Sequence, residues 1–223
     1  MNRSVVTKRI LLEALLIFAA FYLPGYFGAQ PDSPAAYMPQ YLLVSIPQIL
    51  LVVYILWLDG DVPLAEFGFR RPRGLDWLAG AALFAILCAA LLAIQFLSPL
   101  LGEDFEESVS RGYRWRLPRP GLLPLAVLFS LAAGYKEELF YRAYLLTRFR
   151  PPTLPVWTVV AASSLLFAWG HVYQGITAVL FAFLQGLAFS AGFLKIRNVH
   201  VLAAAHGLYN FTALLLSLLL SPP

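Results

Sequence analysis

The stretch GLLPLAVLFSLAAGYKEELFYRAYLLT, residues 121–147, combines an apolar run of membrane-spanning length with the ionisable side chains Lys136, Glu137, Glu138 and Arg142. A helix needs about 20 residues to cross a hydrocarbon core of roughly 30 Å. Ionisable groups at bilayer depth cost at least about 2.5 kcal/mol each, so they are rare and usually functional. This stretch therefore predicts a transmembrane helix that carries part of a polar site.

The rest of the chain is equally apolar. Of its 223 residues 60% are hydrophobic and 13% charged, whereas soluble globular domains are about a quarter charged. Seven segments approach the length of a membrane span: 10–28, 38–58, 75–100, 121–147, 155–172, 175–194 and 199–220. Because short connectors join them, residues 1–223 are predicted to form one all-α domain, a polytopic transmembrane bundle of about seven helices around a polar cavity.

Positive charges gather at one set of helix ends, so the net charge of +4 indicates membrane anchoring and no nucleic-acid partner. Cytoplasmic loops retain Lys and Arg, which predicts a multi-pass plasma-membrane protein with a cytoplasmic N-terminus. The basic residues on that side are Arg3, Lys8, Arg9, Arg70, Arg71, Arg73, Arg148, Arg150, Lys195 and Arg197. The opposite side receives an acidic run and the stretch 111–119, interpreted as an interfacial amphipathic segment or, alternatively, a solvated loop.

Helix spacing separates the two adjacent glutamates. Residues three or four apart share a helix face, so Glu138 is predicted to pair with Arg142. Glu137 lies about 140° round from Arg142, at roughly 100° per residue, and is not fully neutralised by it. Different environments for paired carboxylates separate acid and base roles, so Glu138 is expected to be structural and Glu137 to titrate.

Two further segments carry polar residues at helical spacing. Phe167 and His171 lie four apart, which lets the Phe ring wall a cavity beside the imidazole. His206 and Asn210 also lie four apart, so Asn210 can orient His206 or donate a hydrogen bond to an oxyanion. Taken with Glu137, both histidines are candidate catalytic groups.

Depth sets a condition on this site. At 1.5 Å per residue, Glu137 lies roughly 15 Å and His206 roughly 10 Å from the cytoplasmic ends of their helices, and His171 roughly 25 Å along its own. The three meet only if the helix at 155–172 starts late or tilts. His200 is expected to be an interfacial hydrogen bonder, and Glu13 to lie near the cytoplasmic interface beside Lys8 and Arg9 rather than to act as a second functional carboxylate.

Three motifs on three apolar segments resemble those of a known family. Glu137-Glu138-Leu-Phe-Tyr-Arg142 matches EExxxR, Phe167-Ala-Trp-Gly-His171 matches FxxxH, and His206-Gly-Leu-Tyr-Asn210 matches HxxxN. The chain resembles the CAAX protease and bacteriocin-processing family of intramembrane glutamate proteases, which includes the type II CAAX prenyl endopeptidases. The resemblance covers residues 120–215, with a fainter echo at 67–72.

The resemblance implies a role for each motif residue. Glu137 and His171 would position and deprotonate a water, and His206 and Asn210 would stabilise the tetrahedral oxyanion. Glu138 and Arg142 would hold the site together. The implied substrate is a membrane-anchored protein or peptide, and no cofactor or metal is implied. Ala143 departs from the family pattern, where a Gly commonly follows the Arg, and His200 stands where an aromatic residue is frequent.

Two other functions remain open. One Glu, two His and an Asn can supply a three-ligand open zinc site, although the sequence has no HExxH motif. A membrane scaffold, an immunity protein or a small transporter can also use intramembrane ionisable groups.

Overall fold

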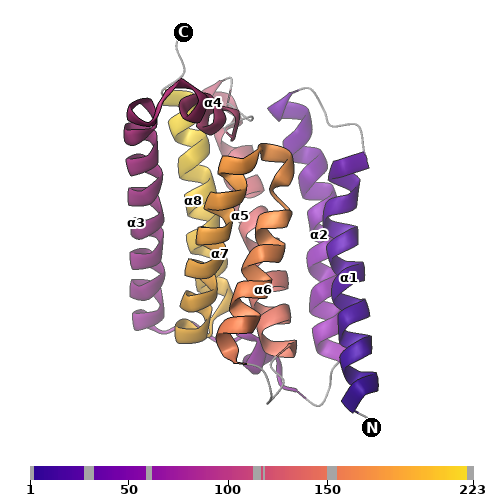
Figure 1. The fold of residues 1–223 in the computed structure, drawn as a ribbon. Coiled ribbons are helices and arrows are strands. Elements are labelled where there is room, and N and C mark those ends of the chain that lie inside the picture. Colours follow the sequence, from indigo (N-terminus) through magenta and orange to yellow (C-terminus); the bar gives the residue numbers. More distant parts are fainter. Residues whose placement is uncertain are drawn as a thin grey trace.

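A computed structural model describes residues 3–27, 33–58, 62–112, 117, 119–149 and 155–219. Within these ranges the chain forms helices joined by short turns (Figure 1). The α-helices are α1 (Arg3–Phe27), α2 (Pro34–Leu58), α3 (Gly74–Leu97), α4 (Glu103–Gly112), α5 (Leu123–Glu138), α6 (Val156–Trp169), α7 (Ile176–Ile196) and α8 (Val199–Leu219). This confirms the predicted helical bundle, and each predicted apolar segment coincides with a helix.

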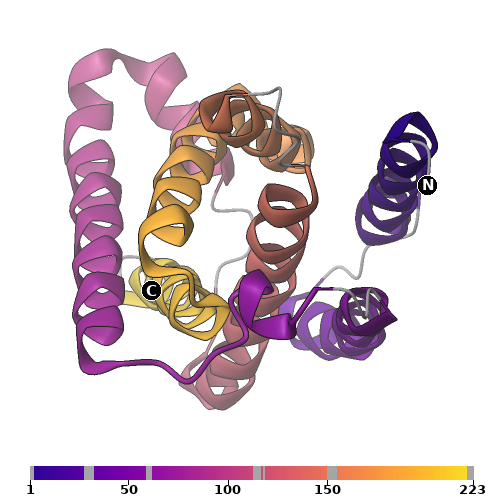
Figure 2. The same cartoon turned by 90° about the horizontal axis from the view of Figure 1, so that it is seen from below.

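Four of these helices are long and apolar enough to cross a membrane: α2, α7, α8 and the stretch Gly74–Leu100 that begins with α3. A shorter apolar helix, α6, has 14 residues, or about 21 Å at 1.5 Å per residue. Seen from below in Figure 2, α1 and α2 lie on one side of the group formed by α5, α6, α7 and α8, and α3 lies on the other. The chain is an integral membrane protein whose motif-bearing helices occupy the centre of the bundle.

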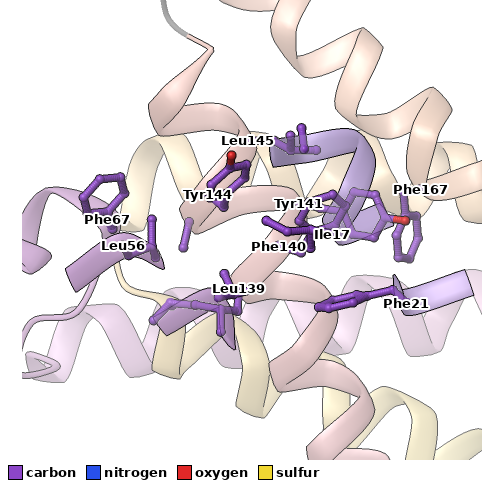
Figure 3. Close-up of a cluster of buried hydrophobic side chains, with 14 of the residues drawn as sticks. Ile17, Phe21, Leu56, Phe67, Leu139, Phe140, Tyr141, Tyr144, Leu145 and Phe167 are labelled. Carbon is purple, nitrogen blue, oxygen red and sulfur yellow. The ribbon is translucent and has the colours of Figure 1, made fainter. Parts of the chain in front are cut away.

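Two elements of the fold were not predicted from the amino-acid pattern. The helix begun by α5 continues as a π-helical segment, η4 (Leu139–Leu146), in which all eight residues are buried. A helix that is apolar nearly all round is buried in the interior, and η4 forms the middle of the core drawn in Figure 3, between α1, α2 and α6. The second element, α4, exposes its acidic residues and buries Val109. It covers the first part of the predicted interfacial segment; residues 113–116 and 118 of that segment lie outside the described residues.

Small residues let α5 and α8 approach closely. A Cβ on Gly134 would lie 2.7 Å from the backbone nitrogen of Gly207, and one on Gly207 would lie 2.9 Å from Cα of Leu131. Small residues four apart are the usual interface of close membrane helices, and Ser130 with Gly134 on α5 meets Ala203 with Gly207 on α8. This contact places the glutamates of α5 beside His206 of α8.

A partly buried ion pair connects the elements at the basic end of the bundle. Arg70 binds both carboxylate oxygens of Asp76, at 2.8 and 2.9 Å, and its Nε donates to the carbonyl of Arg197 at 2.9 Å. In return the Asn198 side chain donates to the carbonyl of Arg70 at 2.8 Å. Residues 67–72, the weaker part of the family resemblance, therefore join the start of α3 to the turn between α7 and α8.

Glu13 lies at the same end of the molecule. Its carboxylate accepts hydrogen bonds from Arg9 at 2.9 Å and from the Tyr144 hydroxyl at 3.1 Å, and it lies 3.7 Å from Arg148. These contacts join α1 to η4. They agree with the expected place of Glu13 among basic residues.

Candidate active site

The two glutamates of the first motif end α5 and have different partners. Glu138 is fully buried, and its Oε1 accepts a hydrogen bond from Arg142 Nη1 at 3.0 Å. This is the ion pair that the spacing of four predicts. The side chain of Glu137 is 12% exposed, and its Oε2 lies 3.5 Å from His206 Nε2. Glu138 is thus neutralised within its own helix, whereas Glu137 faces a different neighbour.

His206 lies between both carboxylates. Its Nδ1 is 2.8 Å from Glu138 Oε1, and a carboxylate that already accepts from an arginine acts as acceptor here too, so Nδ1 carries the proton. Its Nε2 faces Glu137. Phe189 of α7 stacks on the imidazole, with ring centroids 4.6 Å apart and planes at 22°. The ring is therefore fixed both in its plane and in its rotation.

The Arg142 guanidinium is also fully buried, and several groups compensate its charge. Besides Glu138, the carbonyl of Gly186 accepts from its Nη2 at 3.2 Å. The guanidinium carbon lies 4.8 Å from the Phe167 ring centroid and 5.4 Å from that of Phe189. Cations over aromatic faces gain about 0.5–2 kcal/mol. Arg142 thus joins η4, α6 and α7 around the glutamates.

His171 follows the last turn of α6. Its Nδ1 lies 2.8 Å from the carbonyl of Phe167, and a carbonyl only accepts, so Nδ1 donates. In a neutral imidazole the other nitrogen, Nε2, is then an acceptor. The Phe167 ring packs on the imidazole with centroids 4.7 Å apart. His171 is held in the tautomer that a general base or a water-orienting group requires.

A cavity of about 560 Å³ brings the four candidate catalytic residues together, because Glu137, His171, His206 and Asn210 all line it. His171 reaches the same cavity as Glu137 and His206 although α6 does not start late: it begins at Val156, next to its predicted start. The helix ends at Trp169, and His171 lies in the turn that follows. The cavity has the size of a ligand pocket, within the usual range of about 300–1,000 Å³.

Phe167, a supporting residue, and Asn210, a candidate catalytic residue, differ in detail from their expected places. Phe167 is fully buried and packs behind His171 and Arg142 rather than on the cavity surface. Asn210 lines the cavity, but His206 is fixed by the hydrogen bond that its Nδ1–H donates to Glu138. Helical spacing reveals neighbours on one helix only, so the contact between α5 and α8 could not be predicted from it.

Sequence reasoning missed the contribution of the first two helices. Tyr22 of α1 and Tyr41 of α2 line the cavity, and so does Lys136, the neighbour of Glu137. The signal in the sequence was a set of tyrosines inside apolar runs. His200 is not among the lining residues; it is hydrogen-bonded to the Tyr135 hydroxyl and packs edge-on against Phe69.

Across the parts of the chain that the structure describes, no group of three or more His, Cys, Asp and Glu side chains is arranged to hold a metal ion. Direct hydrogen bonds join the Glu138 carboxylate to the Arg142 guanidinium and to the His206 imidazole.

The fold and the site together define a polytopic membrane protein with a buried Glu-Arg-His network beside a cavity. Residues 119–212 match the family model of the type II CAAX prenyl endopeptidases, described as Rce1-like. This segment is therefore similar to that family. It contains all three motifs, and the match confirms the resemblance stated from them. No curated protein and no solved structure matches the chain.

Proposed function

We propose that this chain is a glutamate-type intramembrane endopeptidase that cleaves a membrane-anchored protein or peptide, near its C-terminus as in CAAX-type processing. The family match supports a CAAX-type membrane protease. The observation that carries the proposal is the cavity in which Glu137, His171, His206 and Asn210 face one space.

In this mechanism Glu137 is the general base. It is the glutamate that Arg142 does not neutralise, and it opens onto the cavity. A positioned base contributes about 10²–10⁴-fold to the rate. Glu137 takes a proton from a water molecule in the cavity. Nε2 of His171 accepts a hydrogen bond from this water and so turns a lone pair of the water oxygen toward the scissile carbonyl. Glu137 then passes the proton to the leaving amine.

His206 and Asn210 stabilise the oxyanion that forms as the water attacks. The Asn210 side-chain amide donates directly, whereas Nδ1–H of His206 is held by Glu138. His206 therefore donates from Nε2 only as an imidazolium, and Glu138 stabilises that charge. Removing one oxyanion donor from a preorganised site costs on the order of 10²–10³ in kcat.

Orientation forms part of the same proposal. The N-terminus, the turn before α3 and the turn between α7 and α8 lie at one end of the molecule (Figure 1). Basic residues concentrate there, so we place this end in the cytoplasm and the protein in the plasma membrane.

The test is a comparison of membrane-protein C-termini between cells that make the wild-type chain and cells that make only Glu137→Gln. A peptidase leaves at least one membrane protein with an uncleaved terminus in the variant cells, and that protein is the substrate. Identical sets of termini would reject the proposal and favour a scaffold, immunity or transport role.

A further inference from the structure

A buried lysine shares the cavity with the candidate catalytic groups. Lys136 is 5% exposed and lines the cavity beside Glu137. Its Nζ lies 4.4 Å from the ring centroid of Tyr41 and 5.4 Å from that of Phe21. The hydrolytic mechanism above does not use this cation.

The carboxylates of the site have other partners. Glu138 is bound to Arg142 and His206, and Glu137 Oε2 lies 3.5 Å from His206 Nε2. Among the residues that the structure describes, no hydrogen bond or ion pair joins the Lys136 ammonium group to another side chain. Aromatic faces from α1 and α2 cover it instead.

An ammonium group so placed favours an anionic ligand. Burying a charge without a partner is costly, and cation–π contacts return only about 0.5–2 kcal/mol each. The Coulomb attraction for an anion is several times stronger in such surroundings than in water. A lipid phosphate belongs at the membrane interface, whereas this lysine lies inside the cavity, next in the chain to the proposed base.

We propose, on the basis of the peptidase function above, that Lys136 binds the C-terminal carboxylate of the substrate. The carboxylate forms a charge-assisted hydrogen bond with Nζ while Glu137 activates the water. The two residues are neighbours in the chain, with Cα atoms about 3.8 Å apart, and both line the same cavity. Lys136 therefore selects a free chain end close to the water that Glu137 activates.

The experiment uses the purified full-length chain in detergent micelles. The probe is a fluorescently labelled farnesyl-Cys-Val-Ile-Ala peptide, made once with a C-terminal carboxylate and once with a C-terminal amide. Hydrolysis gives kcat and KM for each form, and fluorescence anisotropy gives Kd. The variants are Lys136→Met, which keeps the length and apolar stem, and Lys136→Arg, which keeps the charge. Thermal unfolding midpoints confirm that each variant is folded.

Wild type is expected to bind the carboxylate peptide on the order of 10-fold to 100-fold more tightly than the amide, as is usual for a charged hydrogen bond. The preference falls toward unity in Lys136→Met and is largely kept in Lys136→Arg. The preference lies in KM and Kd, because the contact is made equally in the ground state and the transition state.

Two results would overturn the inference: equal binding of both peptides by wild type, or a carboxylate preference that survives in Lys136→Met. Loss of kcat for both peptides alike, with the preference intact, would show that Lys136 acts on Glu137 instead. A preference in binding with no hydrolysis of either peptide would keep the carboxylate site and reject the peptidase function.

Discussion

At the residue scale, Glu138 connects the site. One of its oxygens accepts hydrogen bonds from both Arg142 and His206, and all three side chains are at most 2% exposed. Removing one member of a buried ion pair leaves the other charge uncompensated, whereas replacing both with apolar groups is often neutral. A single substitution in the pair should therefore lower the stability of the protein, whereas substituting both residues should restore stability without restoring catalysis.

Glu138→Leu is expected to destabilise the protein by about 3–5 kcal/mol, because it leaves the buried Arg142 guanidinium without its carboxylate. The double variant Glu138→Leu with Arg142→Met should recover most of this loss. Chemical unfolding in micelles measures both. Hydrolysis should stay low in the double variant, since His206 still lacks the acceptor for its Nδ1. An unfolding curve of Glu138→Leu that coincides with wild type would contradict this role.

At the scale of elements, the crossing of α5 and α8 positions Glu137 and Glu138 against His206. Gly134→Ala adds a Cβ that would lie 2.7 Å from the backbone nitrogen of Gly207, and a backbone cannot turn aside as a side chain can. The helices must separate, at a cost of about 1–3 kcal/mol for overpacking. We expect a lower unfolding temperature together with reduced hydrolysis.

Gly121→Ala is the matched control for this variant, because nothing lies within 4 Å of the added Cβ. It should unfold and hydrolyse the peptide as wild type does. If Gly134→Ala behaved in the same way as this control, the close helix crossing would not be what aligns the glutamates with His206.

An element or contact can be predicted from the sequence only when it produces a regular pattern of residues along the chain. Apolar runs of fixed length predict helices, so six of the seven segments match helices to within about four residues at each end, whereas α1 begins earlier than predicted, at Arg3. Spacing along one helix predicts the pair of Glu138 with Arg142. It carries no information across helices, so the link from Glu138 to His206 was missed. The π-helical segment η4 was missed as well, because an α-helix and a π-helix have the same apolar composition.

At the scale of the whole molecule, the bundle places its helices around one cavity with contributions from α1, α2, α3, α5, α7 and α8. Positive charges are concentrated at one end of this bundle, and the acidic α4 lies at the other (Figure 1). The candidate catalytic groups therefore lie inside the bundle, on the wall of this cavity.

Chelation distinguishes the glutamate mechanism from a zinc enzyme built on the same residues. Peptide hydrolysis by the purified chain is expected to be unchanged after treatment with 1,10-phenanthroline and removal of the chelator, with elemental analysis of the same sample as the check. Activity that disappears on chelation and returns with added zinc would instead assign Glu137 and the two histidines to a metal.

The most direct test of the central claim is the rate of peptide hydrolysis by purified Glu137→Gln beside wild type. The substitution keeps the size of the side chain and removes only its capacity to accept a proton. The proposed role of Glu137 predicts a loss of at least about 10²-fold in kcat, with an unchanged unfolding temperature and unchanged Kd for the peptide. Hydrolysis by Glu137→Gln at the wild-type rate would contradict it.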